Sequence, residues 1–458
     1  MTSTSGQPRA TALATEGPEG PEGPGADAPE NLVGTPPEEP LAEQEIAPDL
    51  ARPAGLLSVF RHRNYRLFFT GQIVSLMGSW MQNTAQPWLV YDITHSKLLL
   101  GVVSFCSTVP VFFLTPFGGM VADRVDRRKF LLVTQSAAMI QAAVLATLTL
   151  LHVVQVWEIV CLALTMGLIN AFDVPTRQSM TLDMVGREDL RHAISLNSMM
   201  FNAARVVGPT LAGALIALVG EGICFALNAA SFGAVLFSLL SMRLQERPPR
   251  VNKNALHEVV EGYRYSLSNA EIRLSLLLAG VSSLFGAAYL TMMPAVARDL
   301  LHGDSTTQGT LMSAIGAGAL VGAFLMSRIT EKQLVWAPVA AAVAFGAGLV
   351  AFSHSHALWL SVLFVLPTSM SLMLLGGTTN TIIQLVAEER FRGRVISHYT
   401  QSFLGMMPWG ALLLGAVAAR FGVTDAISLG GLVVILSAAA AFAMRRASGF
   451  SLQHAPAE

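Results

Sequence analysis

The sequence predicts an all-α membrane protein whose twelve transmembrane helices form two six-helix bundles. Three observations predict this fold. Of the 458 residues, 52% are hydrophobic and only 13% are charged, whereas soluble domains carry about 25% charged residues. Apolar runs of about 20 residues, long enough for a helix to cross a hydrocarbon core of ~30 Å, recur along the chain. Basic residues gather in alternate connections between these runs.

Residues 1–55 have a different composition from the rest of the chain. The stretch "GPEGPEGPGADAPENLVGTPPEEPLAEQE" is rich in Pro, Gly and Glu and has few large apolar side chains. Such a segment cannot bury enough apolar surface to offset its chain entropy, so we expect a disordered N-terminal tail. It lacks the basic and then apolar regions of a cleaved signal peptide. Residues 447–458 are expected to form a short C-terminal tail.

The apolar runs divide into two sets of six. The first bundle, residues 56–242, contains runs at 67–90, 98–121, 130–151, 155–174, 196–218 and 222–242. The second bundle, residues 273–446, contains runs at 273–296, 308–328, 334–352, 357–380, 398–419 and 425–444. Between them, the linker 243–272 has apolar residues at helical spacing (Leu256, Val259, Val260 and Tyr263). This spacing predicts an amphipathic helix along the cytoplasmic membrane surface.

The distribution of lysine and arginine predicts the orientation. If the N-terminus is cytoplasmic, the outer connections contain only Lys97, Arg298 and Arg420. The inner connections contain far more basic residues, among them four between Arg124 and Lys129. Because cytoplasmic loops carry the excess of basic residues, both termini are expected in the cytoplasm.

The two bundles also resemble each other in sequence. "VGREDLRHAIS" (185–195) parallels "VAEERFRGRVIS" (386–397), and beyond them Gly208 pairs with Gly410 and Gly213 with Gly415 at a constant separation. A six-helix unit repeated in parallel is typical of transporters in which two halves rock around a site near the middle of the membrane.

The loop "GGMVADRVDRRK" (118–129) between the second and third runs is the most charged point of the apolar part of the chain. It resembles the loop 2–3 signature of the major facilitator superfamily, matched by Gly119, Asp123, Arg124, Arg127 and Arg128. Asp126 departs from the pattern, which usually has glycine there. The resemblance implies a conformational latch, whose carboxylate and arginine contacts form across the interface in one access state only. The alternative interpretation is that the basic residues only fix the loop inside.

The fifth run contains "NAARVVGPTLAGAL", with Gly208, Pro209 and Gly213. It is similar to the Gly-Pro-x-x-Gly element associated with antiporters of the superfamily, in which small residues allow close packing and proline bends the helix. Residues 56–446 as a whole resemble the branch that contains bacterial enterobactin exporters and macrolide exporters. This resemblance implies the major facilitator fold and a multi-pass protein of the bacterial inner membrane.

Three charged residues in or next to apolar runs are candidates for a functional cluster. An arginine at the middle of a bilayer costs about 2.5–3.5 kcal/mol on insertion scales, so Arg205 should face protein or water. Asp173 and Arg177 are four residues apart and therefore share one helical face. We expect the three residues to form an inner charge cluster that serves either in gating and proton coupling or only as a structural ion network.

Polar residues in the apolar runs are candidates for the lining of a substrate cavity. The first run carries a polar stripe with helical spacing, made of Gln72, Ser75, Ser79, Asn83 and Gln86. The superfamily places its first, fourth, seventh and tenth helices around a central cavity, which adds as candidates Thr165, Asn170, Ser282, Tyr289, Thr368 and Thr379. The alternative for each residue is polar packing between helices.

The sequence favours a secondary active transporter, a proton-coupled exporter of a bulky amphipathic molecule of siderophore-like or drug-like type. A lysophospholipid or lipid flippase of the same branch is the alternative. A membrane-embedded enzyme is disfavoured because the sequence has no catalytic motif, and a channel is disfavoured by the duplicated halves. There is no phosphate-binding loop for ATP. Cys106, Cys161 and Cys224 are expected to be small core residues, since no spacing suggests a metal site or a cofactor. We expect a monomer that binds lipid but no nucleic acid.

Overall fold

The computed structural model describes residues 56–122, 124–186, 188–242 and 255–448, without the side chains of residues 56, 116, 255–260, 262 and 448. The expected N-terminal tail, residues 449–458 and the first part of the linker (243–254) lie outside the described residues. Over the described residues the chain is helical and contains no strand. The helices belong to a single unit, residues 54–458.

The helices alternate in direction, as consecutive membrane spans do. We call residues 63–241 the first half, which follows η1 (Leu56–Arg61) and contains α1 (Arg63–Thr94), α2 (Lys97–Ala122), α3 (Arg127–Leu150), α4 (Val156–Val185), α5 (Leu190–Val219) and α6 (Glu221–Ser241). After α7 (Ala255–Ser268) comes the second half, residues 270–448. It contains α8 (Ala270–Val281), η2 (Ser282–Gly286), η3 (Ala287–Met292), α9 (Met293–Ala295), η4 (Val296–Leu300), α10 (Ser305–Met326), α11 (Glu331–Leu334), α12 (Ala337–Ser353), α13 (Leu358–Val386), α14 (Glu389–Phe403), α15 (Met407–Phe421) and α16 (Val423–Ser448).

Ten helical segments of the described chain are long and apolar enough to cross a membrane. One of them, Ala270–Leu300, combines α8 to η4, and another, Glu389–Phe421, combines α14 and α15. Two predicted runs form helices outside this set. Helix α12 is apolar but has only 17 residues, and α1 is long but carries the predicted polar stripe together with charged residues at both ends.

Side-chain caps and glycine turns determine where several helices begin and end. The Asp126 carboxylate accepts hydrogen bonds from the Arg128 and Lys129 amides at the start of α3, and Asn269 and Asp304 cap α8 and α10 in the same way. Gly220 and Gly422 have positive φ angles of 82° and 95° and link α5 to α6 and α15 to α16. A side chain would strain both of these turns.

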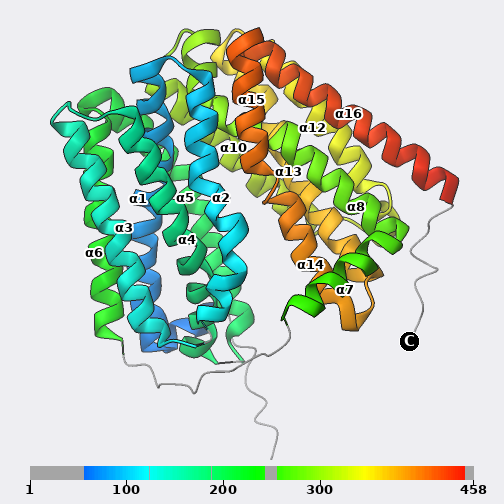
Figure 1. Cartoon of the computed structure of the whole chain (residues 1–458), viewed down its shortest axis with the longest axis horizontal. Coiled ribbons are helices and arrows are strands. Elements are labelled where there is room, and N and C mark those ends of the chain that lie inside the picture. Colours follow the sequence, from blue (N-terminus) through cyan, green and yellow to red (C-terminus); the bar gives the residue numbers. More distant parts are fainter. Residues whose placement is uncertain (1–55, 123, 187, 243–254, 449–458) are drawn as a thin grey trace, which may run out of the picture. The chain divides into compact units, whose positions relative to one another are not determined.

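The helices of each half pack mainly on one another. In the first half, α2 packs on α4, and α6 packs on both α1 and α3. In the second half, α13 packs on both α10 and α12, and α12 also packs on α16. The two halves meet along two seams, α5 with α10 and α2 with α15 (Figure 1).

The seventh predicted span is irregular in the middle. Its helix changes to π geometry over residues 282–286, to 3-10 geometry over 287–292 and again to π geometry over 296–300. A Cβ at Gly286 would lie only 2.4 Å from the ring of Phe345 in α12, so this glycine allows the two helices to approach closely. The irregular turns determine the position of Tyr289, which is almost completely buried.

The predicted amphipathic helix of the linker is present as α7, and its described side chains pack on α14. The ring of Tyr265 stacks on Phe391 with a centroid distance of 4.3 Å, and Glu261 forms a 2.8 Å ion pair with Arg394. Helix α7 therefore docks on the second half, a contact that the sequence analysis did not predict.

Candidate functional site

Glycines bring the backbones together at both seams. A Cβ at Gly213 in α5 would lie 2.7 Å from the Ser305 carbonyl oxygen and 3.1 Å from Cα of Gly309 in α10. A Cβ at Gly415 in α15 would lie 2.8 Å from the Lys97 carbonyl oxygen and 3.3 Å from Cα of Gly101 in α2. The two seams therefore have the same construction.

The contacts at the seams follow the repeat in the sequence. The carbonyl oxygen of Pro209 approaches Gly309 at one seam, and that of Ala411, 202 positions later, approaches Gly101 at the other. Gly208 and Gly410, also 202 positions apart, pack against Trp80 of α1 and Leu284 of η2. The predicted motif Gly208, Pro209 and Gly213 thus lies where α5 meets α1 and α10.

Charged and polar side chains join the halves at the end of the helices that holds residues 94–97 and 300–305, which we call the closed end. Asp299 accepts a 2.6 Å hydrogen bond from the Tyr91 hydroxyl and forms a 2.8 Å ion pair with Lys97. Arg298 pairs with Asp92. Sequence reasoning placed Lys97 and Arg298 in outer connections but missed their partners Asp299 and Asp92, although an acidic residue at the outer end of each half was a signal that could have found them.

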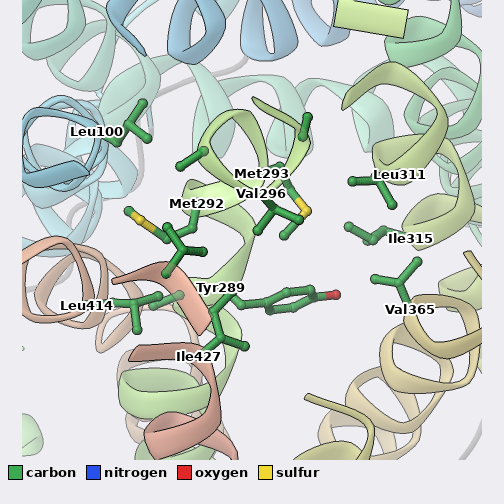
Figure 2. Packing of buried hydrophobic residues seen from close by; sticks show 14 of the residues in the cluster. Leu100, Tyr289, Met292, Met293, Val296, Leu311, Ile315, Val365, Leu414 and Ile427 are labelled. Atoms are coloured by element: carbon green, nitrogen blue, oxygen red, sulfur yellow. The ribbon is translucent and has the colours of Figure 1, made fainter. Parts of the chain in front are cut away.

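An apolar cluster lies next to these polar contacts. It takes buried residues from both halves, among them Leu100 of α2, Met292 of η3 and Leu414 of α15 (Figure 2). Figure 2 shows the ring of Tyr289 within this cluster, with its hydroxyl on the side of Ile315 and Val365. The cluster and the ion pairs together seal the closed end.

Three of the five residues of the predicted polar stripe line a small cavity inside the first half. The cavity has a volume of about 40 Å³ and lies between α1, α3, α4 and α6; its lining includes Gln72, Ser75, Ser79, Asn170, Asp173 and Arg177. A cavity of this size has room for one or two water molecules and not for a bulky substrate. The buried Oε1 atoms of Gln72 and Gln135 have no hydrogen-bond partner, so water is a suitable occupant.

Asp173 is the centre of a buried hydrogen-bond network beside this cavity. One carboxylate oxygen accepts hydrogen bonds from Thr134 (2.8 Å) and from the Gln135 side-chain amide (2.7 Å). The other oxygen lies 2.8 Å from the Arg177 guanidinium. The predicted pairing of Asp173 with Arg177 is therefore present, whereas the two partners on α3 were not found from the sequence.

Among the described residues, Arg205 forms no ion pair or hydrogen bond with Asp173 or Arg177. Its electrostatic neighbour is Tyr289 of the second half, whose buried hydroxyl has no hydrogen-bond partner. The predicted cluster of three charges thus consists of one ion pair, Asp173 with Arg177, and a separate arginine near the seam.

The remaining cavity candidates occupy different surroundings. Asn83 and Thr165 are exposed, and Gln86 is half-buried. Ser282 and Thr379 are buried with hydroxyls that lack a partner, while the Thr368 hydroxyl donates to the Phe364 carbonyl of its own helix. Thr368 also lies where a Cβ at Gly348 of α12 would reach, which is a packing contact between helices.

Residues 54–457 match the transmembrane secretion effector family of the major facilitator superfamily. The chain belongs to this family. It is therefore a membrane transporter of the secretion and export type, and not an enzyme. The described residues contain no group of three or more His, Cys, Asp or Glu side chains that could hold a metal ion.

Bacterial exporters are among the relatives of this transporter. It is 24% identical to the Staphyloferrin A transporter of Staphylococcus aureus, over 81% of this chain and 93% of that protein. It is 25% identical to the Enterobactin exporter EntS of Citrobacter koseri, over 82% and 90% of the two chains. In fold it resembles a bacterial homolog of the human lysosomal transporter Spinster in an inward-facing and unoccupied conformation, with a TM-score of 0.68, 14% identity and coverage of 84% and 97%.

The superfamily loop of this transporter contacts the ends of helices within the first half. Asp123 lies outside the described residues. Arg127 donates a 2.6 Å hydrogen bond to Asp183 at the end of α4, and Arg128 donates to the Leu239 and Leu240 carbonyls at the end of α6. Cations at helix C-termini are stabilised by the helix dipole.

Two glycines of this loop region differ in their contacts. A Cβ at Gly119, the glycine that matches the superfamily pattern, would meet nothing within 4 Å. A Cβ at Gly118, its neighbour, would lie 2.2 Å from the Ala171 carbonyl oxygen in α4. Gly118 is thus the position where α2 and α4 approach closely, and the sequence analysis did not single it out. Arg124 is exposed.

Asp189, just before α5, anchors the segment that precedes α1 in this transporter. Its carboxylate lies 2.8 Å from His62 Nε2, accepts a 3.1 Å hydrogen bond from Ser58 and lies 2.9 Å from the Arg61 guanidinium. The hydrogen bond with His62 and these other contacts lower the pKa of Asp189 below its ordinary value of 3.8, against the opposing effect of burial.

The cysteines differ from the sequence expectation in one case. Cys224 is buried and Cys106 is half-buried, but Cys161 is exposed. The reason is that Cys161 lies on an exposed face of α4, where apolar residues such as Leu164 and Leu168 are also exposed.

Proposed function

We propose that the chain is a secondary active exporter with twelve membrane spans in two six-helix bundles, residues 56–242 and 273–446, and with both termini in the cytoplasm. Helices α1 and α12 complete the set of twelve, since α1 directly precedes the first of the ten apolar spans and α12 lies between Ser305–Met326 and Leu358–Val386. The concentration of arginines at the ends where α2 meets α3 and α13 meets α14 supports this orientation in a bacterial inner membrane.

The exporter works by alternating access, and the contacts at the closed end carry this proposal. The ion pairs of Asp299 with Lys97 and of Arg298 with Asp92 connect the halves on the side away from the arginine-rich loops. In the proposed orientation this is the external side, so the described conformation is open to the cytoplasm. Ion pairs and glycine seams can separate and re-form without breaking the core of either half.

The loop 2–3 residues act as a latch in the opposite conformation. Gly119, Asp123, Arg124, Arg127 and Arg128 are the proposed latch residues. In the described conformation Arg127 and Arg128 contact helix ends of their own half, and Arg124 is exposed to solvent at the cytoplasmic end. A new partner for Arg124 on the second half would stabilise the closed cytoplasmic side.

The transported molecule is a bulky amphipathic compound of siderophore-like or drug-like type. The names of the two bacterial relatives support a siderophore-like molecule. The central cluster of Met, Leu, Ile and Val side chains suits an apolar body, since methionine adapts to irregular shapes. Asn83, Gln86, Thr165, Ser282, Thr368 and Thr379 are proposed to line the path of this molecule in one or both access states.

Export is coupled to protons through Asp173 and Arg177. The carboxylate is buried beside a cavity with room for water, and protonation would weaken its attraction to the guanidinium. Gln72, Ser75, Ser79 and Asn170 line the same cavity and would hold the water through which a proton enters. A monomer is sufficient for this mechanism.

The test is transport into inverted membrane vesicles that contain the chain, with an imposed pH gradient and with siderophores, macrolides and lysolipids as candidate substrates. We expect accumulation of a siderophore or macrolide that depends on the gradient and is absent from vesicles without the chain. Accumulation that ignores the gradient would contradict proton coupling. Accumulation of lysolipids alone would favour a flippase.

A further inference from the structure

Arg205 differs from other charged residues of the spans. Asp173 and Arg177 form a 2.8 Å ion pair, and Glu271 and Arg445 form one of 3.1 Å. Among the described residues, the Arg205 guanidinium forms no hydrogen bond and no ion pair. It lies at the middle of α5, where an unpaired guanidinium is unfavourable. A charge retained at such a position points to a function.

The register of α5 shows which part of the protein Arg205 faces. Gly208, three residues further on, packs against Trp80 of α1, and Pro209, four residues further on, packs against Gly309 of α10. The Arg205 backbone itself lies against Gly316 of α10. Arg205 therefore lies on the face of α5 between α1 and α10, where the first half meets the second.

The group of the second half that interacts electrostatically with Arg205 is Tyr289. The Tyr289 side chain is 1% exposed, and its hydroxyl has no hydrogen-bond partner. A buried hydroxyl without a partner is unfavourable, because folding removes its hydrogen bonds to water without replacing them. A guanidinium offers only donors, and a tyrosine hydroxyl can donate as well, so both groups require an acceptor that the described protein atoms do not supply.

We propose that Arg205 and Tyr289 bind the oxyanion of the transported molecule, which is an amphipathic organic anion. The planar guanidinium fork matches a carboxylate or a phosphate. The surrounding Met292, Leu311, Ile315 and Val365 fit the apolar remainder of the molecule. This inference rests on the proposed export function and adds the charge of the substrate to it. One half supplies the cation and the other the hydroxyl, so movement of the halves would take the site apart and release the anion.

The experiment measures ligand-induced thermal stabilisation of the full chain in lipid nanodiscs. The probes share one alkyl chain and differ in the head group: decanoate, decyl phosphate, decanamide and decyltrimethylammonium. We expect one or both anions to raise Tm in a saturable manner and the neutral and cationic probes to have no such effect. A stronger response to decanoate would indicate that the oxyanion of the transported molecule is a carboxylate. A stronger response to decyl phosphate would indicate a lipid-type phosphate.

Two variants test whether the anion-induced stabilisation arises from binding at Arg205 and Tyr289. Arg205→Gln is expected to raise the half-saturating anion concentration at least tenfold, and Tyr289→Phe several-fold. Arg191→Gln, which removes an exposed arginine from the start of the same helix, is the matched control and should respond as the wild type does. If Arg205→Gln does not fold, the anion response of Tyr289→Phe tests the site, since this substitution removes only a hydroxyl that has no protein partner.

The inference is overturned if the four probes stabilise the wild type equally, or if anion binding is unchanged in both variants. The vesicle assay separates this failure from a failure of the proposed function. If the chain exports a siderophore but shows no preference for anionic probes, the proposed export function stands and the proposed anion site is rejected. If the chain transports none of the candidate substrates, the proposed export function itself is contradicted.

Discussion

Gly213 of α5 lies against Gly309 of α10 so closely that a Cβ added at Gly213 would come within 3.1 Å of the Gly309 Cα. The same contact occurs between Gly415 and Gly101 at the other seam. Close approach of helix backbones through small residues is a recurrent way to pack membrane helices. The two seams are therefore the proposed pivots between the halves.

Substitution at a seam should impair transport more than it impairs folding. We expect Gly213→Ala to cost about 1–3 kcal/mol of packing energy, since the new methyl group meets the Ser305 carbonyl at 2.7 Å. Initial transport rates in vesicles should fall at least tenfold, and Gly415→Ala should behave alike. The matched control is Gly233→Ala in α6, where a Cβ meets nothing within 4 Å. Equal transport in Gly213→Ala and Gly233→Ala would argue against the pivots.

Loss of the Asp173 charge should uncouple transport from the pH gradient. Asp173→Asn leaves Arg177 without its partner, and breaking such a buried pair costs about 3–5 kcal/mol. We expect a lower Tm and substrate exchange that no longer responds to the gradient. The double variant Asp173→Asn with Arg177→Gln should recover much of the Tm but not the coupling. Gradient-driven accumulation by the single variant would exclude Asp173 as the coupling residue.

Removal of the Asp299 carboxylate should open the closed end. Asp299→Asn removes the ion pair with Lys97 and weakens the hydrogen bond from Tyr91, and a hydrogen bond to a charged group contributes about 1.5–3 kcal/mol. We expect the distance between spin labels at positions 95 and 302 to shift toward a longer population. Asp425→Asn, an exposed aspartate at the start of α16, is the control. An unchanged distance distribution would show that these contacts do not hold the halves.

The Asp189 anchor should give a defined pH dependence of stability. Because its folded pKa is lowered, the stabilisation is fully present above the ordinary carboxyl pKa of 3.8 and is lost as the pH falls through the folded pKa. Asp189→Asn should lower Tm at pH 5 to 7. The Tm difference between wild type and variant should shrink below about pH 4, in line with the linkage relation. A difference that stays constant down to pH 2 would contradict the assigned contacts.

Some of this arrangement could be predicted from the sequence because it depends on local patterns. Hydrophobic length predicted helices at all twelve runs, and the spacing of four residues between Asp173 and Arg177 predicted their ion pair. The repeat predicted equivalent roles for Gly213 and Gly415, which make equivalent contacts in the two seams. Each of these features is determined within one helix or by duplication.

Other features depend on partners that are distant in the sequence. The polar stripe of α1 was predicted as one cavity wall, but Gln72 faces a small cavity completed by Gln135 of α3, and Asn83 is exposed. A run of apolar residues has the same hydrophobic pattern whether its turns are α, π or 3-10. The sequence therefore could not predict the irregular turns that orient Tyr289. The docking of α7 on α14 likewise depends on the stacking of Tyr265 on Phe391.

Alternation between the two ends is the central claim, and paired distance measurements during turnover test it most directly. One pair of spin labels at positions 95 and 302 reports the closed end, and a second pair at positions 125 and 392, next to the latch residue Arg124 but not replacing it, reports the arginine-rich end. The labelled chain is reconstituted in proteoliposomes, and substrate and a pH gradient are supplied. The distance between the labels at the closed end should then lengthen in the same fraction of molecules in which the distance at the arginine-rich end shortens. Distances that change in the same sense at both ends, or at neither end while substrate is transported, would contradict the account.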